Sequence, residues 1–214
     1  MELWHLWTSW LASGMAGLSA QFGLSEAMGI IAMTLLVRAG LMPFSLTAAL
    51  RMEANKTRLK AIKPELDALK LRLKNRPAEL GPAIARLYKA HGIRFFDRLA
   101  LANIGSQSAF GIGIYQAIGK SGFGSPFLWI GTIARPDVWL TALVAVLMAI
   151  AMGIAPGAFA EPSMLVMMGV AVIIAVVSIA AMPSAVGLYW ASSNVASVVQ
   201  AVVLRGIVAR RAAA

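Results

Sequence analysis

Apolar residues gather in long unbroken runs rather than in short alternating segments. Five runs are long enough to be considered as membrane spans, at residues 27–50, 99–118, 138–155, 164–182 and 184–204. Hydrocarbon leaves only helices and closed barrels as spanning elements, and the ten-residue alternation of a barrel strand is absent from the sequence. The pattern therefore predicts an all-α integral membrane protein with five transmembrane helices, of which 27–50 is the first.

The first 26 residues precede these runs and carry tryptophans at helical spacing. Trp4, Trp7 and Leu11 fall on one side of a helix, and tryptophan favours the headgroup zone of a membrane. A secretory signal would need a basic N-terminal stretch, which is missing. We expect residues 1–26 to form an interfacial helix on the outer side, with disorder and partial insertion as alternatives.

Basic residues are concentrated between the first two apolar runs. Of the 19 Lys and Arg residues, 13 lie in residues 51–98 beside five acids, and none precedes Arg38. The positive-inside rule then places 51–98 and the C-terminus in the cytoplasm and the N-terminus outside. Residues 99–214 supply four further spans and a short cytoplasmic tail. Without an N-terminal transit sequence, a bacterial plasma (inner) membrane is the expected location.

The basic segment is predicted to be a helical hairpin. Apolar residues recur at three- and four-residue steps over 59–73 and again over 80–87. Residues 75–77 would form the turn, Pro64 would kink or begin the first arm, and Gly92 would cap the second. Its basic face is either a solvated surface beside an anionic membrane or a docking surface for RNA or an acidic partner.

Arg38 is a charge in the middle of the first apolar run. It lies roughly 17 Å from either end of a helix through that run, too far for its side chain to reach water. A charge at this depth costs about 2.5 to 3.5 kcal/mol. No Asp or Glu inside an apolar run could neutralise it. The chain must therefore hydrate Arg38 or surround it with polar groups.

Polar residues line one face of three predicted spans. The three faces carry Thr34, Arg38 and Ser45; Asn103, Ser106 and Gln107; and Trp190, Ser193, Asn194 and Ser197. If these faces converge, they form a hydrophilic cavity with a positive potential, because neutral groups orient a guanidinium without cancelling its charge. The alternative is that Ser, Asn and Gln only join the helices to one another, as in many membrane bundles.

A set of short motifs stands in a characteristic order over residues 27–204. They are Leu35 to Arg38 with Leu41, Met42, Pro43 and Ser45; KAIKPEL at 60–66; Leu87, Tyr88, Lys89, His91 and Gly92; Gln107 with Tyr115; FLWIG at 127–131 with Pro136 and Asp137; and Pro183, Gly187 to Trp190, Ser193, Asn194 and Gln200. In order, spacing and topology these motifs resemble the YidC/Oxa family of membrane protein insertases.

The resemblance implies five spans that enclose a hydrophilic groove, sealed on the outer side. Such insertases help nascent membrane proteins integrate into the lipid bilayer, with no cofactor and no covalent chemistry, so no enzyme activity is expected. By position, Arg38, Gln107, Trp190 and Asn194 would line the groove, and the polar faces add Thr34, Asn103 and Ser193 as client-binding residues. The hairpin is a candidate contact for the ribosome, the signal recognition particle machinery or the Sec translocon.

Other functions fit the sequence less well. A coupled transporter would place carboxylates within its spans, whereas Glu26, Asp137 and Glu161 lie at run ends. An intramembrane hydrolase would need a base near a serine, but His5 and His91 both fall outside the spans. The main alternative to an insertase is a noncatalytic chaperone or assembly factor that holds client helices without translocating them.

Overall fold

The computed structural model describes residues 2–93, 97–159 and 162–213, so Glu161 lies outside the described residues. Within these ranges the chain forms eight α-helices and no strand, which confirms the all-α prediction. The helices divide into two compact units, one of Met1–Pro43 with Ser106–Ala214 and one of Phe44–Gly105. The candidate site belongs to the first unit and the basic hairpin to the second.

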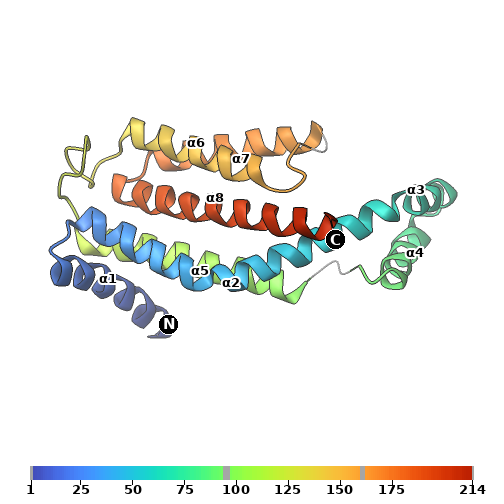
Figure 1. Cartoon of the computed structure of the whole chain (residues 1–214), viewed down its shortest axis with the longest axis horizontal. Coiled ribbons are helices and arrows are strands. Elements are labelled where there is room, and N and C mark those ends of the chain that lie inside the picture. The colour runs from blue at the N-terminus through green and yellow to red at the C-terminus, as the bar shows by residue number, and fades with distance from the viewer. Residues whose placement is uncertain (1, 94–96, 160–161, 214) are drawn as a thin grey trace. The chain divides into compact units, whose positions relative to one another are not determined.

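Six helices contribute to the first unit (Figure 1). They are α1 (Glu2–Phe22), the first part of α2 (Glu26–Ala61), most of α5 (Arg98–Ser121), α6 (Val138–Ile154), α7 (Pro162–Ala180) and α8 (Ser184–Ala213). Helix α6 packs against both α7 and α8. Among the last three helices, α6 therefore lies between α7 and α8.

Helices α2 and α8 are long and apolar enough to cross a membrane, by length and composition. The described residues also include two shorter apolar helices, over Val138–Ile154 and Met164–Ala180. Helix α6 has 17 residues and rises roughly 26 Å, a little less than the ~30 Å of a bilayer core. Five crossings, and the direction of each, stay a prediction.

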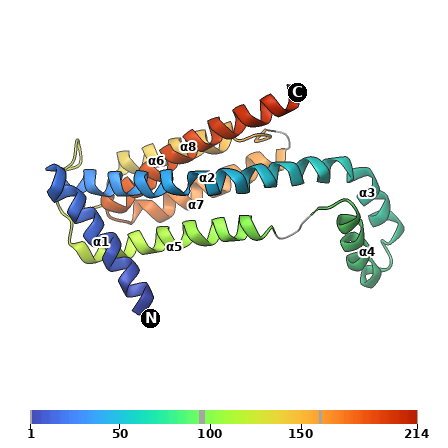
Figure 2. The same ribbon diagram turned by 60° about the horizontal axis from the view of Figure 1, so that its bottom comes forward.

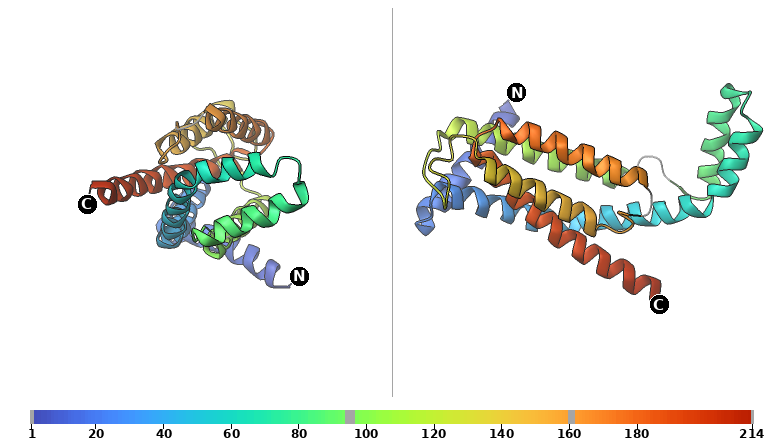
Figure 3. Two further views of the ribbon diagram at one scale, coloured as in Figure 1. Left: turned by 90° about the vertical axis from the view of Figure 1, so that its right-hand side faces the viewer. Right: turned by 90° about the horizontal axis from the view of Figure 1, so that it is seen from above.

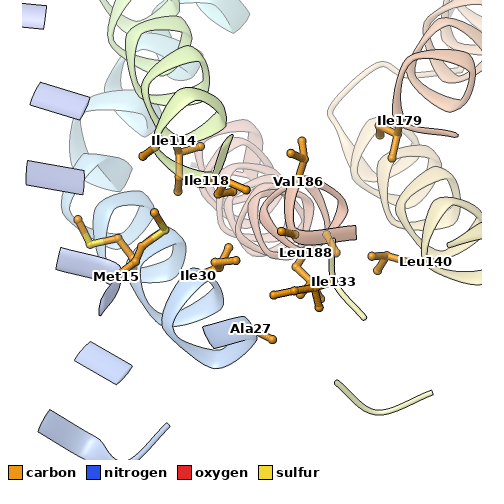
Figure 4. Packing of buried hydrophobic residues seen from close by; sticks show 14 of the residues in the cluster. Met15, Ala27, Ile30, Ile114, Ile118, Ile133, Leu140, Ile179, Val186 and Leu188 are labelled. Carbon is orange, nitrogen blue, oxygen red and sulfur yellow. The ribbon is translucent and has the colours of Figure 1, made fainter. Parts of the chain in front are cut away.

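The apolar core of the first unit lies where α2, α6 and α8 begin and α5 ends (Figure 4). Ile30, Ile114, Ile133 and Val144 are completely buried in it, and Val186 is nearly so. In lipid such a cluster is stabilised mainly by close van der Waals packing, since its side chains gain little by leaving hydrocarbon. This end of the first unit is therefore tightly closed by side chains.

The loop between α5 and α6 is fastened to the first turns of two helices. The Glu26 carboxylate, at the start of α2, accepts hydrogen bonds from the backbone N–H groups of Gly124 (3.0 Å) and Ser125 (2.9 Å). At the start of α8, Ser184 donates to the carbonyl of Arg135 through its backbone N–H (2.9 Å) and its hydroxyl (2.6 Å). The bonds of Glu26 satisfy two N–H groups of the loop, and the Ser184 N–H is one of the donors that the first turn of a helix leaves unpaired, so the loop covers the closed end.

Helix α1 packs against α2 and α5 and crosses α5 (Figure 2). Leu11 and Met15 are completely buried, and the Trp4 indole N–H donates to the Gln116 side-chain oxygen at 2.8 Å. At Gly113 of α5 a Cβ atom would lie 2.5 Å from the Trp7 indole nitrogen. The predicted N-terminal helix is present, and its place at the outer membrane surface stays a prediction.

The second unit contains the rest of α2, the start of α5, and two short helices between them, α3 (Lys63–Arg72) and α4 (Pro77–Ala90). Helices α3 and α4 pack side by side (Figure 3), and Leu66 and Leu73 are buried. Helix α2 continues unbroken to Ala61. The first arm, α3, therefore begins at Lys63, about one turn later than the apolar pattern over 59–73 predicted.

Proline and glycine set the ends of the two short helices. Pro64 lies in the first turn of α3, so it begins this arm and does not kink it. Pro77 begins α4, where a missing N–H costs nothing. Gly92 follows α4 with a φ of 63°, and the Ile93 N–H donates to the Tyr88 carbonyl at 2.8 Å. Gly92 therefore ends α4 with a residue in the left-handed conformation, which is the C-terminal cap expected there.

Candidate functional site

Arg38 is a buried charge on which three helices converge. It lies on α2, and only 8% of its surface is exposed. One guanidinium nitrogen, Nη1, donates to the side-chain oxygen of Gln107 on α5. The other, Nη2, donates to the Ser193 carbonyl at 3.3 Å and to the Ser197 hydroxyl, both on α8. We call Arg38, Gln107, Ser193 and Ser197 the Arg38 cluster.

Every hydrogen-bond acceptor in the Arg38 cluster is neutral. The ion pairs found among residues 2–93, 97–159 and 162–213 join Lys56 to Glu53, Arg76 to Glu79 and His91 to Glu65, so none includes Arg38. Amide, hydroxyl and carbonyl oxygens stabilise a guanidinium through their dipoles but carry no net charge. The cluster therefore keeps a charge of +1 in an environment of low dielectric constant.

Ser197 shares the polar face of the last predicted span but is not among the predicted client-binding residues. Its hydroxyl donates to the Ser193 carbonyl one turn earlier, at 3.0 Å, and accepts a hydrogen bond from Arg38. It thus links the guanidinium to the α8 backbone. Its position four residues after Ser193 was the signal that could have identified it.

Asn194 follows Ser193 on α8 and carries an unsatisfied donor. Its side-chain nitrogen Nδ2 is buried, with no hydrogen-bond partner in the described part of the chain. A buried donor without a partner costs about 1 to 3 kcal/mol, so a residue of this kind is a natural position for a water molecule or a polar group of a ligand.

Three other predicted residues lie outside the Arg38 cluster. Thr34 is completely buried, and its hydroxyl donates to the Ile30 carbonyl of its own helix at 2.7 Å. Trp190 is partly buried and packs against the apolar core. Asn103 belongs to the second unit, so its place beside Arg38 stays a prediction. The structure brings together Arg38, Gln107 and Ser193 of the predicted set.

The hydrophilic groove itself also stays a prediction. Four hollows on the protein surface are candidates for such a groove. Three of them lie in the second unit, and one lies between α1 and α2. The latter has a volume of about 470 Å³ and is lined by residues that include Gly14, Met33 and Val37. None of the four is lined by Arg38.

The chemistry available to the Arg38 cluster is electrostatic. Across the described residues no three His, Asp or Glu side chains come close enough to hold a metal ion. A guanidinium binds carboxylates or phosphates through charge-assisted hydrogen bonds. The cluster is therefore suited to attracting an acidic group into the protein.

Comparison with known protein families identifies the family of the chain. No curated protein matches the chain. A family model described as 60Kd inner membrane protein matches residues 17–211, a range that includes all four residues of the Arg38 cluster. The matched range covers far more than half of the 214 residues. The chain therefore belongs to the 60Kd inner membrane protein family, which is the YidC/Oxa family of membrane protein insertases.

Proposed function

We propose that this chain inserts nascent membrane proteins into the lipid bilayer, and that Arg38 attracts acidic residues of the client's polar flank into a hydrophilic groove. One observation carries the proposal: the buried guanidinium of Arg38 donates hydrogen bonds to neutral oxygens of α5 and α8, and no ion pair formed by the described residues includes it. No acidic side chain in these ion pairs cancels the charge that a client carboxylate would meet.

The magnitude of the attraction suits this role. Two unit charges 4 Å apart interact by about 1 kcal/mol in bulk water and about 4 kcal/mol at an effective dielectric constant of ~20. A carboxylate at the centre of a membrane costs about 2.5 to 3.5 kcal/mol on the insertion scale. A single buried Arg38 could therefore offset much of the cost of bringing one client carboxylate to this depth.

Because the hydrogen-bond acceptors of Arg38 are neutral, a client carboxylate can be both attracted and released. If an Asp or Glu stood in place of Gln107, it would pair with Arg38 permanently and remove the charge that a client meets. The amide and hydroxyl oxygens of Gln107 and Ser197 offer hydrogen bonds that a client carboxylate can replace. The guanidinium can then return to them when the client leaves.

The apolar core supports a groove that is closed at one end. Ile30 precedes Arg38 by eight residues, or about 12 Å along α2, and it packs in the same cluster as Ile133 and Val186. A polar flank drawn to Arg38 thus has a dense apolar layer beyond it on the side of the α5–α6 loop. This side corresponds to the outer face, and the groove opens toward lipid and the cytoplasm.

The topology belongs to the same proposal. Helices α2, α5, α6, α7 and α8 cross the bacterial inner membrane, with the N-terminus outside and the C-terminus in the cytoplasm. The short α6 thins the bilayer beside it, since a helix shorter than the hydrocarbon core draws lipid inward. The hairpin of α3 and α4 faces the cytoplasm, where the ribosome, the signal recognition particle machinery or the Sec translocon can reach it.

Reconstitution of the purified protein in liposomes tests the proposal. A small single-span client with an acidic flank is synthesised in their presence, and the flank is then probed with a protease added outside. An insertase gives a protected flank, which empty liposomes do not. A client that binds to the protein but stays fully digestible would show a holding chaperone and would overturn the proposal.

A further inference from the structure

The second unit contains two hollows of opposite character. One, of about 640 Å³, is lined by residues that include the cations Arg51, Arg58 and Lys89. The other, of about 390 Å³, is mostly apolar, and its lining includes Leu59 and Leu101. Neither hollow involves the Arg38 cluster, which belongs to the first unit.

The two hollows are neighbours that share a wall. Asn55, Ile93 and Asp97 appear in the lining of both. On α2 the residues of the basic hollow lie at 51, 54, 55 and 58, and those of the apolar hollow at 52, 55, 56 and 59. Because these are adjacent faces of one helix, a single molecule could occupy both hollows.

The basic hollow keeps most of its charge. Arg51, Arg58 and Lys89 take part in none of the ion pairs formed by the described residues. Arg58 donates to the Gly92 carbonyl at 3.0 Å, which holds the guanidinium in place without neutralising it. Asp97 accepts from the backbone N–H groups at the start of α5. Three cations and one carboxylate in the lining leave a net charge of +2, which favours an anion.

The apolar hollow is lined by large side chains that remain exposed. Met52, Leu59, Leu101 and Ile104 have between 39% and 60% of their surface accessible. Large exposed apolar side chains on both α2 and α5 favour contact with an apolar partner, which would be either another protein segment or a lipid. The occupant that fits both hollows has an anionic end and an apolar end.

The sequence places these hollows near a membrane surface. Arg51 is the first residue after the apolar run 27–50, and Leu101 and Ile104 lie in the first turns of the run 99–118. On α2 the two hollows lie side by side at the same level, whereas on α5 the apolar hollow extends to Leu101 and Ile104, inside the second predicted span. A phosphate at the level of the headgroups, with an acyl chain directed along α5 toward the hydrocarbon, fits this arrangement.

We propose that the paired hollows bind one anionic phospholipid, with its phosphate in the basic hollow and an acyl chain in the apolar hollow. Arg51 lies on α2, Lys89 on α4 and Leu101 on α5, so the lipid joins the base of the hairpin to the helices that emerge from the membrane. An acidic amphipathic peptide is the competing occupant. The proposal stands independently of the insertase mechanism at Arg38.

Native mass spectrometry of the full-length protein tests this site. The protein, purified in a mild detergent, is incubated with equal amounts of phosphatidylglycerol and phosphatidylcholine, and the retained lipids are counted. We expect one phosphatidylglycerol to be retained with roughly tenfold preference. Equal retention of the two lipids would overturn the proposal.

Two variants of equal charge locate the site. The triple change Arg51→Gln, Arg58→Gln and Lys89→Gln should abolish the preference for phosphatidylglycerol. The matched triple change Lys60→Gln, Lys70→Gln and Lys74→Gln removes the same charge from exposed positions outside both hollows and should leave the preference unchanged. An equal loss in both variants would mean that only overall charge matters, and no site exists.

A third variant and a competitor identify the source of the phosphate. Leu59→Gln with Leu101→Gln should weaken retention of phosphatidylglycerol to the level seen with phosphatidylcholine, because the acyl chain loses its contacts. Glycerol phosphate in excess should displace little of the lipid from the unaltered protein. Full displacement by glycerol phosphate, or by an acidic peptide at equal concentration, would contradict a lipid site.

Discussion

The guanidinium of Arg38 on α2 donates a hydrogen bond to the side-chain oxygen of Gln107 on α5, 69 residues away in the chain. The pair joins a full charge to a neutral amide inside a bundle. Gln107 can therefore be changed in ways that alter the charge of the Arg38 cluster and its hydrogen bonding separately.

Gln107→Glu should leave the protein folded but reduce insertion severalfold. The carboxylate has the same length as the amide and pairs with Arg38, so stability is kept while the net charge of the cluster falls to zero. Gln107→Met should do the opposite. It removes the acceptor, lowers stability by about 1 to 3 kcal/mol, and leaves the charge free to attract a client. Client insertion into liposomes measures the activity of each variant, and thermal unfolding measures its stability. If insertion were lost only in the less stable variant, Gln107→Met, this account would be contradicted.

A cysteine at position 193 should react with a charged maleimide in intact membranes. The chain has no native cysteine, so Ser193→Cys gives a single thiol in the Arg38 cluster, where we expect water. Val195→Cys is the matched control two residues later, since Val195 is 43% exposed on an apolar surface of α8. The thiol of Val195→Cys should react with membrane-permeant reagents but not with the charged maleimide. Equal resistance of both thiols to the charged reagent would show that the cluster is dry.

Gly113→Ala should loosen α1. The new Cβ would lie 2.5 Å from the Trp7 indole nitrogen and 3.0 Å from the Leu11 side chain, so α1 must shift, at a cost of about 1 to 3 kcal/mol. Gly119→Ala, on the same helix, meets nothing within 4 Å and should be neutral or stabilising by about 0.5 to 1 kcal/mol. Thermal unfolding and protease cleavage in α1 check this, and equal effects of the two changes would count against the packing described.

Removal of the hairpin should impair client delivery more than folding. Helices α3 and α4 pack against each other and Leu66 of α3 is buried, so replacing residues 63–90 by a Gly/Ser linker removes the hairpin together with its own buried side chain. We expect normal amounts of protein in the membrane but reduced insertion of clients in cells. Loss of the protein from the membrane would show instead that the hairpin supports the fold.

The sequence predicted the helices better than it predicted their ends. The apolar run stops at residue 50, where the composition becomes basic, but α2 continues to Ala61. Backbone hydrogen bonds of a helix do not depend on whether its side chains face lipid or water, so a change in composition does not mark a helix end. Pro64 and Gly92 did mark helix ends, whereas Pro77, which was expected in the turn, is the first residue of α4.

Only part of the site could be predicted from the sequence. Helical spacing reveals which residues share a face, and it identified Arg38, Gln107 and Ser193. It does not reveal which faces meet or where a hydroxyl finds its acceptor. Thr34 shares the face of Arg38 but bonds to its own backbone, whereas Ser197 contacts the guanidinium directly. Such choices depend on tertiary packing, which one sequence does not specify.

The central claim is that the charge of Arg38 acts on acidic groups in the client. Insertion should therefore be measured for two clients that differ only in an acidic or neutral flank, with both the unaltered protein and Arg38→Gln in liposomes. We predict that Arg38→Gln reduces insertion of the acidic client by roughly tenfold or more and that of the neutral client much less, as expected for losing a few kcal/mol of attraction. An equal reduction for both clients would contradict the account, because Arg38 would then matter only for the structure of the protein.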